Sequence, residues 1–268
     1  QLDQAMVGVN VVFHLAGIAH VDLPDPSVLY NVTVTGTDNV IAAAQRAGVE
    51  RLIYFSSSLA LAAEQQLPMA SDYGLAKLQA EQLIRQSLKN GKPDYCILRP
   101  VNVYGPGMKG NIANMIRLIA QKRLPPLPDL PGRMSLVSVD DLSAAALLAA
   151  QSPQVGGNTY YVTDGQVYPV NALEEAIYQA LGLQKPTWRC PRVVLYAGAW
   201  GAGLIQRLRS RNSRVSTIGR RTYDNLLRDN VVSNKSLVDD LGFEPKDTFY
   251  SALPELVTAL QNNGKQYD

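Results

Sequence analysis

The chain has 268 residues, of which 46% are hydrophobic, and its 25 Lys and Arg nearly balance 23 Asp and Glu. This composition excludes a disordered, collagen-like or coiled-coil protein and leaves apolar material for one large domain or two modest ones. A net charge of +2 gives no reason to expect a nucleic acid as partner. The sequence contains two Cys, Cys96 and Cys190, and two His, His14 and His20. They supply neither a zinc site of usual spacing nor a disulfide framework, so we expect a metal-free protein of the reducing cytoplasm.

The sequence also bears on membrane attachment. Gln1–Met6 is polar and leads into a strand pattern, which is unlike a signal peptide. The longest apolar stretch, Val193–Ile205, is shorter than the roughly 20 residues that a membrane-spanning helix needs, so we expect a buried or an interfacial helix there. Arg207–Arg221 follows with six Arg and no acidic residue. Three interpretations stay open for it: a diphosphate-binding face, an interfacial helix on anionic lipid, and a solvated basic surface.

Short strand-type runs alternate with runs of helical spacing. Strands are predicted at Asn10–Leu15, Arg51–Phe55, Tyr95–Leu98, Leu136–Val139 and Thr159–Val162. Helices are predicted at Val28–Ala47, Tyr73–Leu88, Asn111–Gln121 and Asp140–Ala150, with a loop at Leu59–Asp72. Because the first three strands are nearly continuous apolar runs, we expect them to be buried on both faces of a parallel sheet. The predicted fold class is α/β, a doubly wound parallel sheet with a smaller, mainly helical C-terminal lobe.

Small or polar residues follow three of these strands. Ala16 and Gly17 follow the first strand, Ser56–Ser58 follow the second, and Asn102 comes shortly after the third. In open α/β sheets ligands bind at the carboxyl ends of the strands, so these separate segments are expected to converge on one site. We expect residues 1–104 and 134–165 to form the sheet domain, and residues 105–133 and 166–268 to form the other lobe.

Tyr73 and Lys77 are the residues whose spacing indicates chemistry. Four positions apart, they lie on one face of a helical turn. A phenol is a poor base at neutral pH, and a fixed positive charge beside it favours the phenolate and lowers its pKa. Such a pair suits proton transfer to or from a hydroxyl or carbonyl oxygen. Tyr and Lys are common on exposed helix faces, so the spacing alone is weak. His14, within a strand, is interpreted as structural.

In this context the chain resembles the extended short-chain dehydrogenase/reductase family, particularly its nucleotide-sugar epimerases, dehydratases and 4-keto-reductases. The matching segments occur in the family's order: Val11–Gly17, Gly36-Thr37, Phe55–Ser58, Tyr73 with Lys77, Leu98–Gly107, Leu136–Leu142 and Leu241–Pro245. The resemblance implies a Rossmann-like fold with NAD or NADP as cofactor. It also implies action at C4 of a nucleotide sugar, with UDP-N-acetyl-hexosamines of surface-polysaccharide synthesis as the nearest substrates. A homodimer is one assembly that it leaves open.

The same resemblance assigns roles to individual residues. Tyr73 would be the general acid/base, Lys77 would bond the nicotinamide ribose, and Ser58 would hydrogen-bond the reacting oxygen. The cofactor would be contacted by Tyr73 as well as Lys77, and it would be lined further by Ala16, Gly17, Ser56, Ser57 and Pro100. The substrate would be contacted by Ser58, Asn102, Asn111 and Arg133, which stands next to Met134 where similar enzymes carry Arg. For two of these residues a purely structural role stays open. Ser58 could hydrogen-bond backbone groups at a strand end, and Asn111 could be an ordinary helix cap.

One feature of the family is absent from the sequence. The family begins with a strand, a Gly-x-x-Gly-x-x-Gly turn and a helix that hold the cofactor pyrophosphate, and Gln1–Val9 instead resembles the helix before its fourth strand. We expect the chain to be an incomplete, inactive fragment of such an enzyme. Two alternatives are a hydroxysteroid or flavonoid-type reductase of the same superfamily and a truncated non-catalytic homologue. The choice between NAD and NADP cannot be made from these residues.

Overall fold

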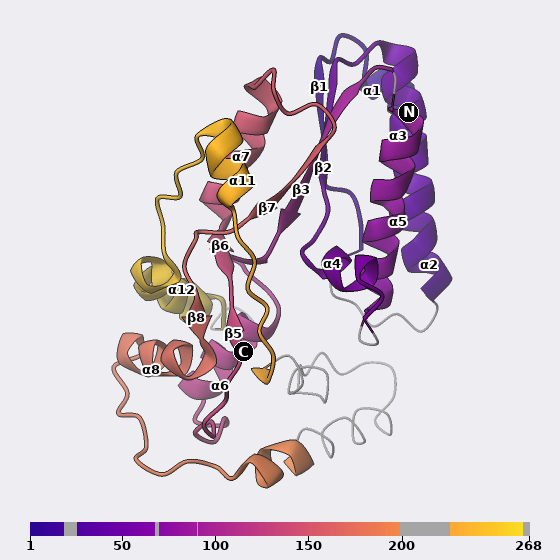
Figure 1. Ribbon diagram of the computed structural model, residues 1–268. Helices are drawn as coiled ribbons and strands as arrows, with labels where there is room; N and C mark the ends of the chain where they lie inside the picture. The colour runs from indigo at the N-terminus through magenta and orange to yellow at the C-terminus, as the bar shows by residue number, and fades with distance from the viewer. Residues whose placement is uncertain (19–25, 68–69, 90, 199–225, 265–268) are drawn as a thin grey trace. The chain divides into compact units, whose positions relative to one another are not determined.

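The computed structural model describes residues 1–18, 26–67, 70–89, 91–198 and 226–264, which form two compact units (Figure 1). The first unit comprises Gln1–Val103, Val139–Gly165 and Val232–Lys246. The second comprises Tyr104–Ser138, Gln166–Val231 and Asp247–Asp268. The basic segment Arg207–Arg221 lies outside the described residues, so the three interpretations of it stay predictions.

The first unit is built on a four-stranded parallel sheet of order β1-β2-β3-β7. Its strands are β1 (Val11–His14), β2 (Arg51–Phe55), β3 (Asp94–Pro100) and β7 (Asn158–Val162). Val12 lies opposite Leu52, and Leu52 lies opposite Tyr95, so β1, β2 and β3 are paired without an offset. The central residues Leu52–Tyr54 and Tyr95–Leu98 are buried on both faces, as their apolar runs predict. The α/β prediction is confirmed.

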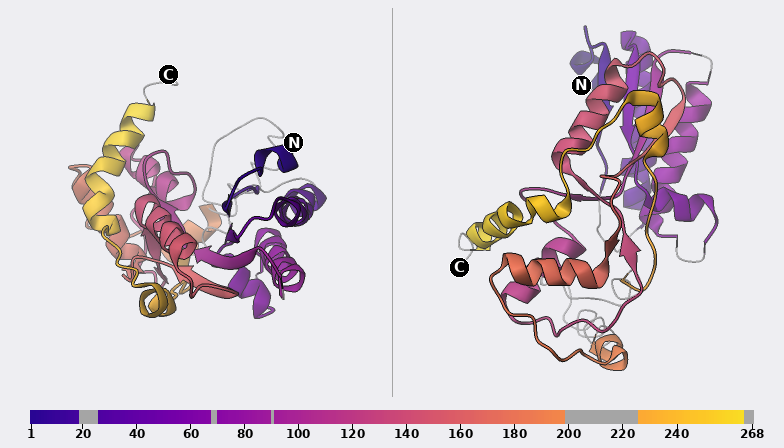
Figure 2. Two further views of the ribbon diagram at one scale, coloured as in Figure 1. Left: turned by 90° about the horizontal axis from the view of Figure 1, so that it is seen from above. Right: turned by 60° about the vertical axis from the view of Figure 1, so that its left-hand side comes forward.

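Helices cover both faces of this sheet. They are α1 (Leu2–Ala5), α2 (Pro26–Tyr30), η1 (Asn31–Thr35), α3 (Gly36–Ala47), α4 (Leu59–Glu64), α5 (Asp72–Ser87), α7 (Val139–Gln151) and α11 (Lys235–Leu241). Figures 1 and 2 show α3 and α5 on one face and α7 on the other. Val40, Ile41 and Ile84 pack with Leu52 and Ile97 of the sheet in one apolar cluster, which fixes α3 and α5 against β2 and β3.

Three predictions for the first unit need correction. β1 is not buried on both faces: it is an edge strand of the described sheet, and Phe13 and Leu15 are 37% and 60% exposed. The predicted loop Leu59–Asp72 contains the helix α4, whose sequence Leu-Ala-Leu-Ala-Ala-Glu consists of strong helix formers. The predicted helix Val28–Ala47 is interrupted by η1, a π-helical turn in which Gly36 N–H donates to the Asn31 carbonyl.

The second unit is mainly helical. It contains α6 (Asn111–Ala120), α8 (Val170–Ala180) and α12 (Phe249–Gly264), with β6 (Leu136–Ser138) and the antiparallel pair β5 (Arg133–Met134) and β8 (Tyr168–Pro169). The chain passes from the first unit to the second within the short strand β4 (Asn102–Tyr104). Tyr168 and Phe249 meet edge to face in the core of the second unit, and the Tyr168 hydroxyl accepts the Phe249 N–H at 3.0 Å.

The apolar stretch Val193–Ile205 is described only in its first part. Residues 192–198 form a helical segment in which Val193 and Val194 are 77% and 57% exposed, whereas Leu195 is buried. This part is therefore not a buried helix, the interfacial alternative stays a prediction, and residues 199–205 lie outside the described residues. No helix in the described parts of the chain is both long and apolar enough to span a bilayer.

Candidate active site

The segments that follow β2 and β3 stay side by side beyond the sheet. The Ser56 N–H donates to the Leu98 carbonyl at 2.8 Å, and the Ser58 N–H donates to the Pro100 carbonyl at 2.9 Å. Because β1, β2 and β3 are parallel, their carboxyl ends lie at one edge of the sheet, where open α/β sheets bind ligands. The structure thus brings Pro100 together with the predicted serines.

Lys77 of α5 connects this edge to the end of β1. Its side chain is buried, and Nζ donates to the Phe55 carbonyl at 2.7 Å. A Cβ atom added to Gly17 would lie 3.5 Å from Lys77 Nζ, so the exposed segment Ala16-Gly17 passes directly beside the ammonium group. Burial lowers the pKa of Lys77 to about 8, against the opposing effect of the Glu81 carboxylate.

Tyr73 stands one helical turn before Lys77. The Lys77 Nζ lies 5.9 Å from the centre of the Tyr73 ring and 4.8 Å from that of Tyr54. Tyr73 is half-buried, and burial raises the pKa of its phenol above the usual value. The lowered pKa that the sequence predicts for Tyr73 is therefore not found in the protein by itself, because desolvation by burial sets the direction of the shift. Tyr73 holds its proton at neutral pH.

Ser58 and Tyr73 flank a close contact between α4 and α5. The Cα of Gly74 lies so near Leu59 that an added Cβ would approach the Leu59 carbonyl oxygen to 2.5 Å. Ser58 directly precedes Leu59, and Tyr73 directly precedes Gly74, so the contact gathers both residues at the start of their helices. The Ser71 side chain caps α5 by accepting the Gly74 N–H at 3.0 Å. Glycine is needed here because backbone meets backbone.

We expect Gly74→Ala to lower the free energy of unfolding by about 1–3 kcal/mol, because the added methyl group must push the Leu59 backbone aside. At a helix position without such a contact, alanine instead of glycine would stabilise the protein by about 1 kcal/mol. A loss of stability therefore indicates the close contact. Urea unfolding measures it. Gly36→Ala in α3 is the matched control, because its Cβ would meet only the Asn31 carbonyl at 3.9 Å. A Gly74→Ala protein as stable as Gly36→Ala would contradict the contact.

The other two serines are bonded within the protein. The Ser56 hydroxyl is buried and donates to Glu81 Oε1 at 2.5 Å, and the Ser57 hydroxyl accepts the Leu59 N–H at 3.2 Å. Ser57, rather than Ser58, therefore satisfies the backbone at the start of α4, and Ser58 makes no side-chain capping bond there. Asn102 is exposed in β4. These serine bonds leave Ser58 as the serine best suited to meet a ligand.

Two predicted substrate residues belong to the second unit. Asn111 is exposed and is the first residue of α6, whereas Gly110 occupies the cap position with a φ of 98°. The interpretation of Asn111 as the helix cap is therefore wrong. The exposed Arg133 guanidinium donates to both carboxylate oxygens of Asp229, with the shortest distance 2.5 Å. This pairing raises the pKa of Arg133 and partly neutralises its charge.

Sequence reasoning missed the ion pair beneath Lys77. Glu81 is fully buried on α5 and pairs with the buried Arg99 of β3 at 2.7 Å. The sequence did contain an indication of this pair, because Glu81 lies one helical turn after Lys77 and Arg99 is a charged residue in an otherwise apolar strand. A charged residue in a buried strand requires a partner, but the sequence does not say which one.

His14 lies beneath the same edge and is buried. Its Nε2 and the Thr37 hydroxyl are 2.9 Å apart, and that hydroxyl donates to the Thr33 carbonyl at 2.6 Å. Burial, aided by the Lys77 charge, lowers the pKa of His14 to about 4. His14 is thus neutral at neutral pH and is held by η1 and α3, which agrees with a structural role.

We expect acid to destabilise the protein partly through His14. Between pH 6.5 and 4 the unfolded chain binds a proton at His14 that the folded chain does not, so the free energy of unfolding falls as pH falls. The loss on going from pH 7 to pH 4.5 should be about 2–3 kcal/mol larger in the wild type than in His14→Gln. Denaturant unfolding at both pH values measures this difference. Equal losses in the two proteins would contradict a neutral buried imidazole.

Comparisons with known proteins identify the family of the chain. The model of the NAD dependent epimerase/dehydratase family matches residues 1–163. UDP-glucose 4-epimerase of Vibrio cholerae is 28% identical over 96% of this chain and 78% of its own length. N-acetyl-alpha-D-glucosaminyl-diphospho-ditrans,octacis-undecaprenol 4-epimerase of Escherichia coli O157:H7 is 24% identical over 81% of this chain and 68% of its own length.

A solved structure shares the fold. UDP-glucuronic acid 4-epimerase from Bacillus cereus, in complex with NAD, superposes with a TM-score of 0.75 at 16% identity, over 100% of this chain and 78% of that one. The parallel sheet and the family match agree. The chain belongs to the NAD dependent epimerase/dehydratase family.

Proposed function

We propose that the protein is a nicotinamide-dependent epimerase or 4-keto-reductase acting at C4 of a UDP-sugar, with N-acetylated hexosamines of surface-polysaccharide synthesis as the favoured substrates. Family membership and the relatives named as UDP-sugar and N-acetylglucosaminyl-diphospholipid 4-epimerases support this choice. The observation that carries it is the meeting of Tyr73, Lys77 and Gly17 at the sheet edge.

The residues at this edge fit a nicotinamide cofactor. The exposed Ala16-Gly17 segment has no side-chain bulk, and a side chain on Gly17 would fill the space beside Lys77 Nζ. Lys77 would bond the ribose, and Ala16, Gly17, Pro100 and backbone near Ser57 would line the ring. NAD or NADP, when bound, supplies hydride transfer to and from the sugar carbon. The Ser56 hydroxyl already donates to Glu81, so we do not assign the Ser56 side chain to the cofactor.

Tyr73 and Ser58 would handle the reacting oxygen. In the direction of ketone reduction, Tyr73 starts with its proton in place, because burial raises its pKa, and donates it to the developing alkoxide at C4. Ser58 would hydrogen-bond the same oxygen and orient it. In the direction of alcohol oxidation, Tyr73 must accept the proton, and the Lys77 charge one turn away favours the phenolate that does so.

The UDP half of the substrate is assigned to three further residues. Asn102 and Asn111 can bond diphosphate oxygens through their amides, and Arg133 can pair with a phosphate. Arg133 is bonded to Asp229, so a diphosphate would have to compete with that carboxylate. We expect Arg133→Ala to weaken UDP binding less than Asn102→Ala for this reason.

The protein expressed from its complete reading frame tests this function. Isothermal titration calorimetry with UDP, NAD and NADP tests binding, and NMR follows the conversion of UDP-glucose, UDP-N-acetylglucosamine and a UDP-4-keto sugar. We expect UDP binding together with epimerisation or reduction at C4. Turnover of a hydroxysteroid without UDP binding would overturn the substrate class. Nicotinamide binding without turnover of any alcohol or ketone would indicate a non-catalytic homologue.

A further inference from the structure

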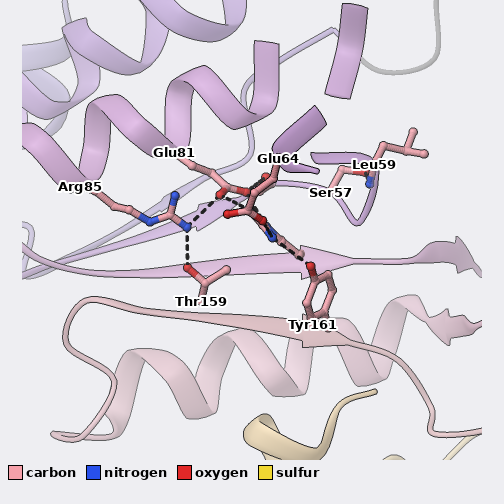
Figure 3. Close-up of polar contacts among 9 residues, drawn as sticks. Ser57, Leu59, Glu64, Glu81, Arg85, Thr159 and Tyr161 are labelled. Carbon is pink, nitrogen blue, oxygen red and sulfur yellow. Dashed lines mark hydrogen bonds and ion pairs between the residues drawn. The ribbon is translucent and has the colours of Figure 1, made fainter. Parts of the chain in front are cut away.

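A buried ion cluster lies next to the candidate active site (Figure 3). Arg99 Nε and Nη2 donate to the two carboxylate oxygens of Glu81 at 2.9 and 2.7 Å. Arg99 Nη1 donates to Glu64 of α4 at 2.7 Å and to the Tyr161 hydroxyl of β7 at 2.9 Å. Arg85 donates to Glu81 from the next turn of α5. One guanidinium thus joins α4, α5 and β7 to β3.

The cluster is bonded to the same two elements that position Lys77. Lys77 and Glu81 are one turn apart on α5, and Phe55 and Ser56 are consecutive at the end of β2. Lys77 Nζ donates to the Phe55 carbonyl, while the Ser56 hydroxyl donates to Glu81. These two parallel bonds fix α5 against β2 at two successive turns, so the helix can neither rotate nor slide without breaking one of them.

We propose that Glu81 and Arg99 are positioning residues of the active site, which hold α5 in the one register that places Lys77 and Tyr73 at the carboxyl edge of the sheet. This inference rests on the proposed function for its catalytic consequence, whereas the placement of Lys77 is a property of the protein alone. Glu81 and Arg99 bond each other, and their further bonds run to Ser56, Arg85, Glu64 and Tyr161. Their effect is therefore exerted through Lys77.

The geometry explains why these two residue types are used. A guanidinium presents two parallel N–H groups to one carboxylate and keeps further donors for other partners. Arg99 uses that capacity to bond Glu81 twice while also reaching Glu64 and Tyr161. A lysine at position 99 has a single ammonium group and cannot reproduce this arrangement. Arg99→Lys should therefore keep the positive charge at this position but no longer hold α5 in its register against the sheet.

A purely stabilising role is the competing explanation, and Glu64 separates the two. Glu64 and Glu81 both accept from Arg99, but the Glu64 side chain is 45% exposed and belongs to α4, whereas Glu81 is fully buried on α5. Glu64→Gln removes one carboxylate from the cluster without touching the bonds between α5 and β2. It is the matched control for Glu81→Gln.

The charge state of Lys77 provides a readout that does not depend on turnover. The titratable groups that face its ammonium are His14 from β1, Tyr54 from β2, and Tyr73 and Glu81 from α5. Glu81 is the one carboxylate that acts on Lys77 among the described residues, and it favours the charged amine. The Lys77 Cε resonance, assigned with Lys77→Arg, reports its titration by NMR in protein labelled with 13C-lysine.

The experiment compares Glu81→Gln, Glu64→Gln and wild type. For Glu81→Gln we expect the Lys77 titration midpoint to fall by about one pH unit. We expect its kcat to fall by about tenfold to a hundredfold with KM for the UDP-sugar nearly unchanged. For Glu64→Gln both quantities should stay within about twofold or 0.2 pH unit of wild type, whatever its thermal stability. Equal effects of the two variants on Lys77 and on kcat would overturn the positioning role.

A second variant keeps the proposal testable if Glu81→Gln fails to fold. Glu81→Gln combined with Arg99→Met removes both charges, so neither is left buried without a partner. We expect this double variant to fold, to show the same fall in kcat and to show a raised Lys77 midpoint, because the two opposite charges are lost together while a displaced Lys77 regains water. Wild-type values for both would overturn the proposal. If the wild type turns over no UDP-sugar, the Lys77 midpoint of the double variant, in which no net charge is lost, still decides the positioning role, so the two failures are distinguishable.

Discussion

We expect Tyr73→Phe to lower kcat for UDP-sugar conversion by about 10²–10⁴-fold, because the variant removes the group that would carry the proton to and from the C4 oxygen. Tyr73 is half-buried, and phenylalanine fills the same space, so the fold should survive and cofactor binding should weaken only by the loss of one hydroxyl bond to the ribose. Steady-state kinetics measure kcat, and calorimetric titration with NAD and NADP measures cofactor binding in both proteins.

Tyr54→Phe is the matched control for this substitution. The Tyr54 ring lies nearer to Lys77 Nζ than the Tyr73 ring does, and its side chain is fully buried in β2. It lies outside the proposed path of the proton, so its variant should keep kcat within a few-fold of wild type. A Tyr73→Phe protein that retains activity equal to that of Tyr54→Phe would remove Tyr73 from the chemistry.

The second large effect is on stability. We expect Arg99→Met to lower the free energy of unfolding by about 3–5 kcal/mol, because the fully buried Glu81 carboxylate loses its bidentate partner. The Ser56 hydroxyl and Arg85 remain as donors, but neither replaces two charge-assisted bonds. Guanidinium chloride unfolding at neutral pH measures the loss.

An exposed ion pair gives the reference for this stability change. Arg46 and Asp3 are 2.7 Å apart in the same unit, and their side chains are 62% and 63% exposed. Arg46→Met should cost no more than about 1 kcal/mol, because water and salt screen such pairs. If Arg99→Met costs as little as Arg46→Met, the cluster around Glu81 does not carry the energy that its burial implies.

The sequence predicted the central elements of the sheet well and its edge poorly. The apolar runs of β2 and β3 and the helical spacing of α5 were sufficient to predict these three elements. In each of them the apolar residues of the sequence pattern are the ones that the fold buries. β1 has a similar run, yet Phe13 and Leu15 are exposed. A strand's sequence does not reveal whether a neighbour covers its outer side. η1 was missed because a single π-turn adds only one residue to a helix and has no sequence signature of its own.

The candidate site, like the sheet, was predicted from the sequence only in part. The pairing of Tyr73 with Lys77 follows from helical geometry, so the sequence could find it. The pKa of Tyr73 depends on how much water the fold removes, and the sequence showed only the neighbouring charge. The bonds that join Glu64, Glu81, Arg99 and Tyr161 link four separate elements, and no local pattern specifies them.

A crystal structure of the protein with NAD and UDP is the most direct measurement of where the chemistry takes place. We predict that the Lys77 ammonium and the Tyr73 hydroxyl both bond the nicotinamide ribose, that the ring lies over the Ala16-Gly17 segment, and that Ser58 faces the space beside nicotinamide C4. A dinucleotide bound away from the carboxyl ends of β1 and β2, or a Tyr73 hydroxyl turned to solvent far from Ser58, would contradict the site described.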